Sequence, residues 1–513
     1  MRSSVDDITR TAPAPWPEPV TIDKADPRYP DLAGRGINAR FPAAPAAIGL
    51  PATPRHVAEL VEDAVGAGRR LAVRSGGHCF ESLVDHPEVD VVIDLSEMKA
   101  VGYDPEHRAL AVEPGASLGA MYRTLFLGWG VAVPAGRCPE IGVGGHVPGG
   151  GGGALSRRYG LSVDHLYGVQ VVVADGSGRA RAVTATREPG DPNRDLWWAH
   201  TGGGAGAFGV VTRYLFRSPD GAAGDGRLLP PAPAAVTKKT VRWSWDDLDE
   251  SRFVALVRAF GLWHERNSAP GDSGAQLDNS LTLPRAGGGE VTLETAFDAG
   301  RPDAADLADA LIADVGRAAG SSPEVTAETR SFLAAVLVPD EFAGVKGRFK
   351  SKAAFLRSCW QEDVVARLYR RLTDRSGYQN PAAAFYLLSH GGAINAVGQE
   401  ETAMAHRDAV LKAYGSVFWW DPREDEVHLG WIRDTYHELF ADAGGVPDPD
   451  RGYGGAFVNY ADADFADPEL NRSGVPWHRL YFRGNYARLQ EVKGRWDPGE
   501  VFRHALSVRP PGA

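Results

Sequence analysis

The sequence is poor in cysteine, has no long apolar run and carries no excess of basic residues. Its three cysteines, Cys79, Cys138 and Cys359, are too few and too scattered among 513 residues for a disulfide framework or a zinc site, so we expect no metal. No run of about 18 apolar residues occurs, and residues 1–19 lack the apolar core of an export signal. We therefore expect a cytoplasmic protein with no membrane partner.

The overall charge limits the class of partner further. The net charge is −11 at pH 7, and no basic stripe is present that could neutralise phosphates, which argues against a nucleic-acid partner. Hydrophobic residues make up 43% of the chain and charged residues 24%, as in an ordinary globular protein. The length favours two large domains, and the oligomeric state stays open.

The first part of the chain alternates short β-rich runs with turns, which predicts an α+β domain. A helix is expected over residues 118–129 and another near residues 195–204. A Gly/Pro/Ala-rich segment follows, so we place the first domain at residues 1–216 and a linker at residues 217–236. The β-like runs are residues 69–78, 89–96, 109–115, 131–137, 168–176 and 208–216.

The pattern changes after the linker. Long amphipathic stretches at residues 252–267 and 303–320 predict helices, and β-like runs lie between them. We assign residues 237–451 to a second domain. The final part, residues 452–513, contains a Lys/Arg-bearing helix that should stop at Asp497-Pro498-Gly499.

Three glycine-rich segments lie within the first domain. Arg74-Ser75-Gly76-Gly77-His78 follows an apolar strand, so its glycines can turn sharply and direct backbone N–H groups at a phosphate. The second segment is GVGGHVPGGGGG at residues 142–153, and the third runs from Gly202 to Gly209. Taken singly, the first is a simple turn and the second a linker. Three in one domain favour a dinucleotide cofactor, because glycine lets the backbone approach a large flat ligand that any Cβ would meet.

Together these residues resemble the FAD-linked oxidases of the vanillyl-alcohol-oxidase or PCMH-type fold, specifically the berberine-bridge-enzyme-like branch. RSGGH with His78 resembles the motif whose histidine bonds the flavin 8α-methyl group. PAGRCPEIGVGGH with Cys138 resembles the motif whose thiolate bonds flavin C6. The stretch from Tyr453 to Val508 is similar to the closing signature of the family, and the overall look is that of bacterial antibiotic-tailoring oxidases.

The resemblance implies both a fold and a set of flavin contacts. The FAD-binding domain is expected to form from the N- and C-terminal parts of the chain, around a central substrate domain with an antiparallel sheet backed by helices. FAD would be covalently bound to His78 and Cys138. The other cofactor-binding residues that the resemblance implies are Arg74, Ser75, Gly76, Gly77, Cys79, Gly142, Val143, Gly144, Gly145, His146, Gly149, Gly209, Val210, Asn459 and Asn485.

Tyr460 is the candidate for the catalytic base. Removing a hydride from a carbon that bears a hydroxyl group requires a base for the hydroxyl proton. Tyr460, in VNYAD, matches the position that serves as base in related alcohol oxidases. A free phenol has a pKa of about 10, so the flavin or a nearby cation would have to favour its ionised form. The alternative is a core tyrosine. Tyr386 and Asn395 are supporting candidates, where the second-domain sheet of the family faces the flavin.

Two positions depart from the family pattern. Ile141 follows Cys138 by three residues, where valine is common in members that react with oxygen and leucine in members that react poorly. Isoleucine is β-branched like valine but bulkier, so it is expected to fill part of the space over the flavin. Gly152 stands where an aromatic residue usually lines the active site, so that side should be roomier.

The leading hypothesis is an oxidase of secondary metabolism. It would oxidise an alcohol of a polyketide, glycoside or related natural product, a small-molecule substrate, and reduce O2 to H2O2. One alternative is an oligosaccharide oxidase, and another is a flavoenzyme for oxidative cyclisation or C–C bond formation. A flavoprotein whose cofactor only shapes a pocket is the non-redox alternative. Aromatic side chains that could stack on sugars are Trp243, Trp245, Trp263, Trp419 and Trp420.

The two attachment points allow a direct test by intact mass. After denaturation, the chain should keep one FAD, and the variants His78→Ala and Cys138→Ala should each keep it through the remaining bond. Release of free FAD from the unmodified chain contradicts the covalent attachment.

Overall fold

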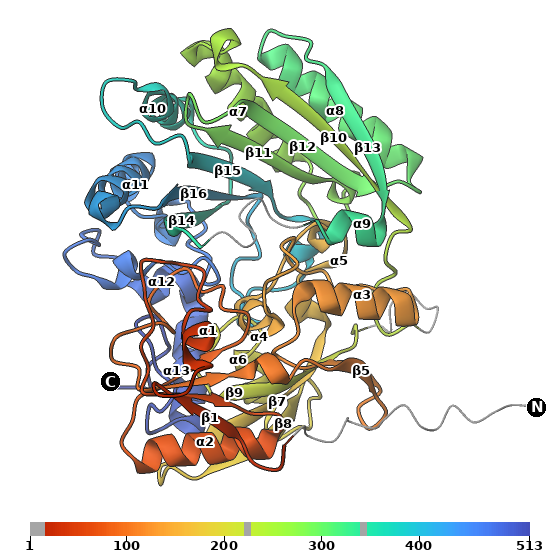
Figure 1. Ribbon diagram of the computed structural model, residues 1–513. Helices are drawn as coiled ribbons and strands as arrows, with labels where there is room; N and C mark the ends of the chain where they lie inside the picture. Colours follow the sequence, from red (N-terminus) through yellow and green to blue (C-terminus); the bar gives the residue numbers. More distant parts are fainter. Residues whose placement is uncertain (1–15, 220–226, 339–345, 513) are drawn as a thin grey trace, which may run out of the picture.

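Strands from distant parts of the chain join into sheets in the computed structural model, which describes residues 16–219, 227–338 and 346–512. Figure 1 shows a large sheet with its helices in the upper part of the molecule and two smaller sheets in the lower part. One hydrophobic cluster of buried side chains extends from Leu110 in the lower part to Leu293 in the upper sheet and to Leu489 near the C-terminus. The two parts therefore share a continuous core.

The first small sheet has four strands in the order β1-β2-β4-β3. They are β1 (Val20–Asp23), β2 (Ala47–Leu50), β3 (Leu71–Arg74) and β4 (Val91–Asp94), with helix α1 (Tyr29–Ala33) after β1. β2, β4 and β3 run parallel. Helix α2 (Pro54–Gly66) connects β2 to β3, and Thr53 caps it by accepting a hydrogen bond from the His56 N–H. β3 leads directly into the first glycine segment.

The second small sheet has five antiparallel strands in the order β5-β6-β9-β7-β8. They are β5 (Val101–Asp104), β6 (Ala109–Val112), β7 (Leu166–Ala174), β8 (Ala180–Thr186) and β9 (Val210–Phe216). Four helices lie between these strands, namely α3 (Leu118–Trp129), α4 (Val143–His146), α5 (Ser156–Tyr159) and α6 (Arg194–Ala199). The second glycine segment passes through α4 between β6 and β7.

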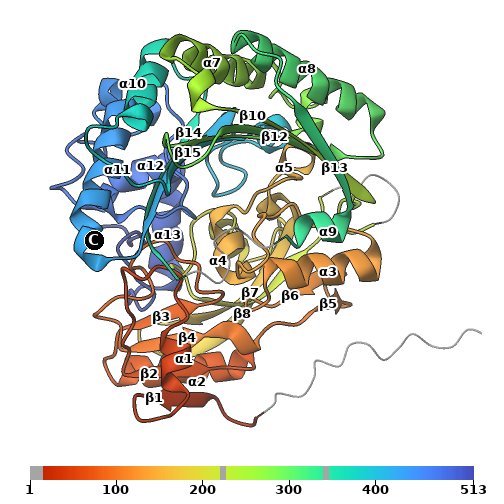
Figure 2. The same ribbon diagram turned by 45° about the horizontal axis from the view of Figure 1, so that its top comes forward.

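The central part of the chain forms a seven-stranded antiparallel sheet with helices on its outer face (Figure 2). In spatial order its strands are β13 (Val325–Ser331), β10 (Ala235–Trp243), β12 (Val291–Asp298), β11 (Asp278–Pro284), β15 (Ala383–Ser389), β16 (Leu411–Trp419) and β14 (Arg348–Leu356). The helices are α7 (Glu250–Arg266), α8 (Pro302–Ala318), α10 (Glu362–Thr373) and α11 (Asp425–Leu439), and the short α9 (Phe332–Val336) follows β13. Burial alternates strictly along β12, as expected for a sheet with one covered face.

The C-terminal part returns to the smaller sheets through α12 (Trp477–Phe482) and α13 (Tyr486–Trp496). Buried Lys493 of α13 donates hydrogen bonds to Ala207 O at 2.6 Å and Phe502 O at 2.7 Å, and it pairs with Asp497 at 2.5 Å. These bonds join α13 to the loop before β9. The lower part therefore contains the described N-terminal and C-terminal segments, as predicted. The domain boundaries stay predictions, and β10 begins inside the proposed linker, part of which lies outside the described residues.

Most of the expected elements are present, with one error. The helix expected over residues 118–129 is α3, which Ser117 caps and Gly130 ends at φ 66°. The expected strand at residues 131–137 is wrong, because only Val131 forms an isolated bridge there. Proline at 134 supplies no N–H, and the carbonyl of Pro134 accepts from the Ser162 hydroxyl instead of a neighbouring strand.

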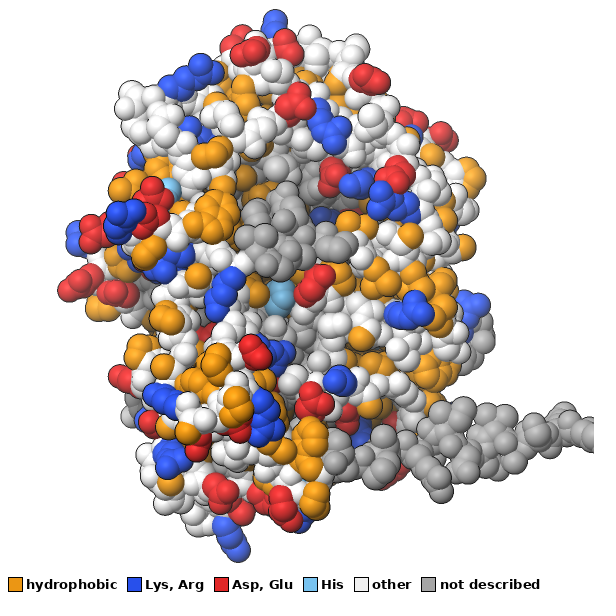
Figure 3. Space-filling view, in the orientation of Figure 1, with side chains coloured by type: hydrophobic (Ala, Val, Ile, Leu, Met, Phe, Trp, Pro, Cys, Tyr) orange, Lys and Arg blue, Asp and Glu red, His pale blue; other side chains and the backbone are white. Residues whose placement is uncertain are grey.

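The described residues contain no helix that is long and apolar enough to cross a membrane. Nor do they contain a group of three or more His, Cys, Asp or Glu side chains that could hold a metal ion. On the face shown in Figure 3, acidic and basic side chains are interspersed.

Candidate functional site

A cavity of about 1090 Å³ lies between the glycine-rich loops and the inner face of the seven-stranded sheet. Side chains from β10, β11, β12, β14, β15 and β16 line one side of it. The opposite side comes from residues within segments 34–37, 71–80, 136–153, 204–206, 457–461 and 502–504. The cavity thus collects residues from both ends and the middle of the chain.

A backbone contact that only glycine permits holds the loops of His78 and Cys138 together. A Cβ on Gly76 would collide with the backbone nitrogen of Gly142 and lie 2.9 Å from its Cα. Gly77 adopts φ +77°, a conformation that favours glycine, beside the carbonyl of Arg35. The two predicted attachment residues therefore line one cavity despite their separation in the sequence.

The second glycine segment leaves open space in one place and close contacts in another. Gly145 is exposed in the cavity, and a Cβ there would meet no atom within 4 Å. At Gly149, a Cβ would collide with the side-chain amide of Asn459, whose Nδ2 donates to His146 O at 2.8 Å. Gly149 therefore admits the C-terminal segment, and Gly145 leaves open space in which a planar ligand can approach the backbone.

His146 is held in its neutral form. Its Nε2 accepts a hydrogen bond from the Gly136 N–H at 3.0 Å, which places the ring proton on Nδ1. Burial, and then the charge of Lys412, lower the pKa of His146 to about 4. This histidine therefore presents a neutral ring to the cavity at physiological pH.

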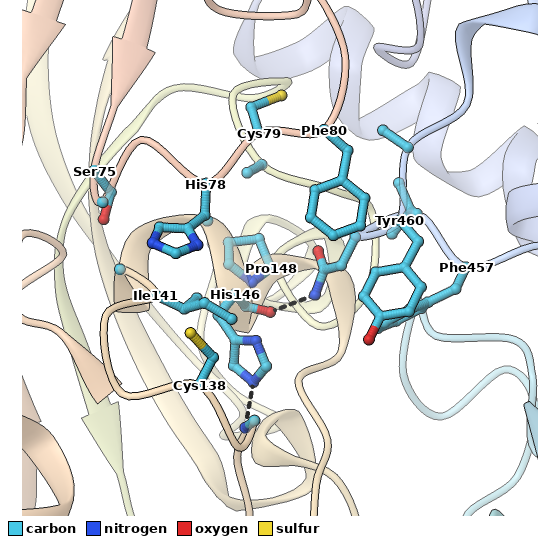
Figure 4. Close-up of a pocket in the computed structure, with 18 of the residues that line it drawn as sticks. Ser75, His78, Cys79, Phe80, Cys138, Ile141, His146, Pro148, Phe457 and Tyr460 are labelled. Atoms are coloured by element: carbon cyan, nitrogen blue, oxygen red, sulfur yellow. Dashed lines mark hydrogen bonds between the residues drawn. The ribbon is translucent and has the colours of Figure 1, made fainter. Parts of the chain in front are cut away.

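The two predicted attachment residues lie on the same side of the cavity (Figure 4). The thiol of Cys138 donates a hydrogen bond to Glu140 Oε2 at 3.2 Å. The side chain of Ile141 also lines the cavity beside them. Tyr460 and Phe80 lie across from His78 and Cys138 in the same view. A flat ligand between these groups would meet a nitrogen and a sulfur nucleophile from one side.

Arg74 and Cys79 line the same cavity, and each forms hydrogen bonds within the protein, although Arg74 Nη1 has no hydrogen-bond partner among the described residues and lies 3.6 Å from Asp85 Oδ1. Arg74 Nε donates to Asp94 Oδ2 at 2.8 Å, and its Nη2 donates to Leu32 O at 2.6 Å. The thiol of Cys79 donates to Glu81 O at 3.2 Å, and burial raises its pKa to about 11. Arg35, which the sequence analysis missed, also pairs with Asp94 and lines the cavity.

The structure brings most of the predicted residues to the cavity, but four lie elsewhere. Ser75, Gly76, Gly77, Gly142, Gly144, Gly145, Gly209 and Asn459 line it, whereas Val143, Gly149, Val210 and Asn485 do not. Asn485 is buried and donates to the carbonyls of Gln399 at 2.8 Å and Thr402 at 3.2 Å. The supporting candidates also divide, because Tyr386 lines the cavity and Asn395 instead donates to Ala409 O at 2.9 Å.

Tyr460 lies in an aromatic cluster at the edge of the cavity. Its ring stacks on Phe80, with centroids 5.2 Å apart and an interplanar angle of 18°. Tyr414 and Phe457 contact it at 5.2 and 5.3 Å in edge-on arrangements. The ring therefore has packed neighbours on several sides, which restrict its orientation.

Lys412 is a candidate functional residue that the sequence analysis missed. It projects from β16 toward the cavity, and its Nζ lies 4.5 Å from the centroid of the Tyr460 ring. Burial, and then the charge of Arg137, lower the pKa of Lys412 to about 7, although Asp278 opposes them. The signal available in the sequence was a lysine in a strand of mostly apolar residues. Its partner, Tyr460, belongs to the C-terminal segment, so the local sequence did not reveal the contact.

The inner face of the sheet combines polar and aromatic side chains. Tyr386 and Tyr414 are opposite each other on β15 and β16 and stack at 4.4 Å. The polar side chains that line the same wall include Lys238, Asp278, Ser280, Thr282, Thr292 and Glu294. None of the five tryptophans proposed as stacking faces is among the described residues that line the cavity.

The position of Gly152 does not simply enlarge the cavity. A Cβ there would lie 2.9 Å from Leu161 Cδ2 and 3.4 Å from Ser156 Oγ. Leu161 therefore occupies part of the space that an aromatic side chain at position 152 would need.

Two protein families match the chain at the segments that line the cavity. Residues 45–179 match the FAD binding domain family, and residues 456–509 match the family described as berberine and berberine like. The first match includes His78 and Cys138, and the second includes Tyr460.

Curated relatives and solved structures resemble nearly the whole chain. Aclacinomycin-N/aclacinomycin-A oxidase of Streptomyces galilaeus is 49% identical over 96% of this chain and 90% of its own length. Hexose oxidase of Chondrus crispus is 28% identical over 95% of this chain and 94% of its own. The crystal structure of aclacinomycin oxidoreductase has a TM-score of 0.93 and 48% identity, covering 96% and 100% of the two chains. That of a glycopeptide hexose oxidase complexed with teicoplanin has a TM-score of 0.92 and 43% identity, covering 96% and 99%.

The glycine surface at Gly145 fits FAD and provides a test. We expect Gly145→Leu to fold normally, because nothing in the protein occupies that space, but to purify with little FAD. Gly66→Leu is the matched control, since a Cβ at Gly66 in α2 also meets nothing within 4 Å and lies outside the cavity. Flavin absorbance per chain and the midpoint of thermal unfolding are the measurements. Full FAD content in Gly145→Leu contradicts this role.

Proposed function

Because the chain belongs to the berberine-bridge-enzyme-like FAD-linked oxidases, we propose that it oxidises an alcohol of a polyketide, glycoside or related natural product to a carbonyl. The observation that carries the proposal is the arrangement of the cavity. His78 and Cys138 lie on one side of it, and Tyr460 lies on the other with Lys412 above its ring. We place FAD between these groups.

The proposal includes attachment of FAD at both nucleophiles. The imidazole of His78 would be bonded to the 8α-methyl carbon, and the sulfur of Cys138 to C6. A thiolate is the nucleophilic form of cysteine, so Cys138 must lose a proton. Glu140 Oε2, at 3.2 Å from the sulfur, is placed to accept it. Two bonds would retain the cofactor in a cavity wide enough for a large substrate.

Tyr460 would accept the hydroxyl proton of the substrate. When bound, FAD supplies the acceptor for the hydride that leaves the carbinol carbon. A phenol is a weak base in its neutral form, but a cation nearby favours the ionised form. The ammonium group of Lys412 is at 4.5 Å from the ring centroid, and it is present when Lys412 is protonated. Lys412 would therefore help to keep Tyr460 in the phenolate form that can accept the proton at Oη.

The mixed lining of the sheet wall supports a substrate with both ring systems and hydroxyl groups. The stacked pair Tyr386 and Tyr414 offers aromatic faces, and Asp278, Ser280 and Thr282 of β11 offer hydrogen-bonding groups. The relatives named for aclacinomycin and for a glycopeptide hexose add support, because both names denote substrates of secondary metabolism. We infer a glycosylated natural product as the leading substrate class.

Oligosaccharide oxidation is the second candidate. The polar residues along β10, β11 and β12 favour it, as does the likeness to hexose oxidase. The absence of the five tryptophans from the described cavity lining removes the stacking argument for it. Oxidative cyclisation remains the alternative within the same cofactor chemistry.

Dioxygen is the proposed electron acceptor and hydrogen peroxide the proposed product. Ile141 lines the cavity next to Cys138. Its side chain is β-branched like that of valine but larger, so it would fill part of the space over the flavin. Oxygen consumption with equal formation of hydrogen peroxide would accompany turnover.

Anaerobic flavin bleaching tests the proposed reaction. The purified protein is mixed with aclacinomycin, free hexoses and oligosaccharides, and the loss of oxidised flavin absorbance is followed. We expect a glycosylated polyketide to bleach the flavin and to yield a carbonyl product by mass. Tyr460→Phe should slow bleaching by about 10²- to 10⁴-fold, the usual contribution of a general base. If no alcohol bleaches the wild-type flavin, the proposed function fails, and a cyclised product would favour the alternative.

Lys412 gives the reaction a pH dependence with a definite sign. With a pKa of about 7, Lys412 is charged below pH 7 and loses its charge as the pH rises above it. We expect Lys412→Met to slow flavin reduction at pH 6 by about 3- to 30-fold, the range of a cation–π interaction. Near pH 9 the variant and the wild type should approach each other.

The matched control for this prediction is Lys239→Met. Lys239 lies 5.8 Å from the centroid of the Phe297 ring, on the opposite face of the same sheet. It should leave the pH profile unchanged. Equal slowing of Lys412→Met at both pH values would show that its charge is not what matters.

A further inference from the structure

A cluster of six charged side chains lies behind the aromatic wall that holds Tyr460. Three are basic and three acidic, and five of them are buried. They are Lys350 and Lys352 of β14, Arg433 of α11, Glu81, Asp462 and Asp464. The proton transfer described above does not use them, and the local sequence around each gives no sign of the others.

The side chains of the cluster form ion pairs with one another. Lys350 Nζ lies 2.6 Å from Asp462 Oδ1 and 3.1 Å from Asp464 Oδ1, and it also pairs with Glu81. Lys352 Nζ lies 2.6 Å from Asp462 Oδ2 and 2.9 Å from Asp464 Oδ2. Each aspartate thus divides its two oxygens between two lysines, which fixes the plane of the carboxylate.

Arg433 completes the set from the outer helix. Its Nε and Nη2 donate to the two oxygens of Asp464 at 3.0 and 2.9 Å, in the bidentate arrangement typical of strong charge-assisted pairs. Its side chain is 31% exposed, whereas that of Asp462 is fully buried. The cluster therefore extends from the rim of α11 to the interior beside Tyr460.

Two members of the cluster, Asp464 and Lys350, keep their charges despite their burial. Burial alone would raise the pKa of Asp464, but Lys352, Lys350 and Arg433 outweigh it and hold that pKa well below its usual range. Burial alone would lower the pKa of Lys350, but Asp462, Glu81 and Asp464 raise it above its usual value. Such a cluster is not by itself a source of stability, because desolvation offsets the attraction. Stabilisation of the fold therefore does not explain why these charged groups are buried together.

Each of three cluster members adjoins, or lies two residues from, an aromatic residue of the cavity wall. Glu81 follows Phe80, Lys350 follows Phe349, and Asp462 lies two residues after Tyr460. The aromatic residues contact each other in turn. Phe80 stacks on Tyr460 at 5.2 Å and meets Phe349 edge-on at 5.2 Å.

Two neutral groups reinforce the same junction. Asn38 is buried, and its Nδ2 donates to Phe80 O at 2.8 Å and Phe349 O at 3.1 Å. The backbone N–H of Asp462 donates to the hydroxyl of Tyr481 at 3.0 Å. Strand β14, the loop after His78 and the segment after Tyr460 are therefore joined on the side away from the cavity.

We propose that this ionic cluster is a positioning device for Tyr460, with Asp462 and Lys350 as its central positioning residues. The inference rests on the proposed function, because it assigns the cluster a task in proton transfer to Tyr460. Its charges anchor three backbone segments, and the aromatic residues beside them set where the phenol points. Loss of the charge on one carboxylate removes an ionic partner from two lysines. The Tyr460 segment can then shift. A misplacement of about 1 Å is enough to reduce a rate by about 100-fold.

The main test uses Asp462→Asn, which keeps the shape of the side chain and removes its charge. The measurement is the rate of anaerobic flavin reduction across substrate concentrations. We expect the limiting rate to fall by about 10- to 100-fold while the substrate dissociation constant changes by less than about twofold. In a Tyr460→Phe background, the same change should reduce the rate by less than about threefold, because the group that it positions is gone.

Asp425→Asn is the matched control. Asp425 of α11 pairs with Arg348 of β14, so its loss weakens the contact of the same strand with the same helix without touching the cluster. Its limiting rate should stay within about twofold of the wild type. If Asp462→Asn matches this control, or if it slows Tyr460→Phe as much as it slows the wild type, the positioning role is wrong.

A second readout does not depend on turnover. In protein labelled with 3-fluorotyrosine, the ¹⁹F resonance of Tyr460 is identified by its loss in Tyr460→Phe. We expect Asp462→Asn to shift or broaden this resonance and Asp425→Asn to leave it unchanged. An unchanged resonance in Asp462→Asn overturns the inference.

The two proposals can fail separately. If no substrate bleaches the wild-type flavin, the proposed function fails, and the ¹⁹F comparison still decides whether the cluster orients Tyr460. If the wild type reacts and Asp462→Asn reacts equally well, only the positioning role fails.

Should Asp462→Asn not accumulate, Arg433→Met replaces it. Arg433 is partly exposed, and its substitution removes one ionic partner of Asp464 at the rim of the cluster. The same two readouts apply to it with a smaller expected effect.

Discussion

The contact between Gly76 and Gly142 is the constraint on which the site depends. Their backbones approach so closely that neither position has room for a Cβ. The contact joins the loop after a parallel strand to a loop from the other small sheet, and it places His78 and Cys138 at one cavity. The same glycine-rich segment receives the amide of Asn459 one position before Tyr460. Close packing without side chains thus locates groups from three distant parts of the chain.

Burial disfavours the charged form of each basic group around this cavity, and the partners of the group decide whether its charge is kept. His146 accepts a backbone hydrogen bond, faces no carboxylate pair and has a pKa of about 4. Asp278 favours the charged form of Lys412, but burial and the charge of Arg137 outweigh it, and the pKa of Lys412 falls to about 7. Lys350 has three carboxylates around it and keeps its charge. The cavity therefore contains a cation that titrates near neutral pH, whereas Lys350 behind its aromatic wall keeps its charge there.

The sequence predicted most of the local elements correctly, because these depend on near neighbours, and the structure brings its three glycine-rich segments to one cavity. Helix α3 follows from the cap at Ser117, its apolar spacing and Gly130. The expected strand at residues 131–137 was wrong because β-like composition does not reveal whether a partner strand is available. Asn485 resembled a flavin contact, yet its amide bonds to backbone carbonyls, since the path of residues 399–403 was unknown from the sequence.

By itself, the sequence determined the fold class, the family and the residues that we propose as attachment points for a flavin. These features are encoded in short motifs and in periodicity, which act over a few residues of chain. Only the tertiary structure decided that Lys412 lies over Tyr460 and that Asp462 shares its carboxylate with two lysines of β14. Both depend on the register of the central sheet and on where the C-terminal segment crosses it. Those contacts join residues far apart in the chain, and no local pattern specifies them.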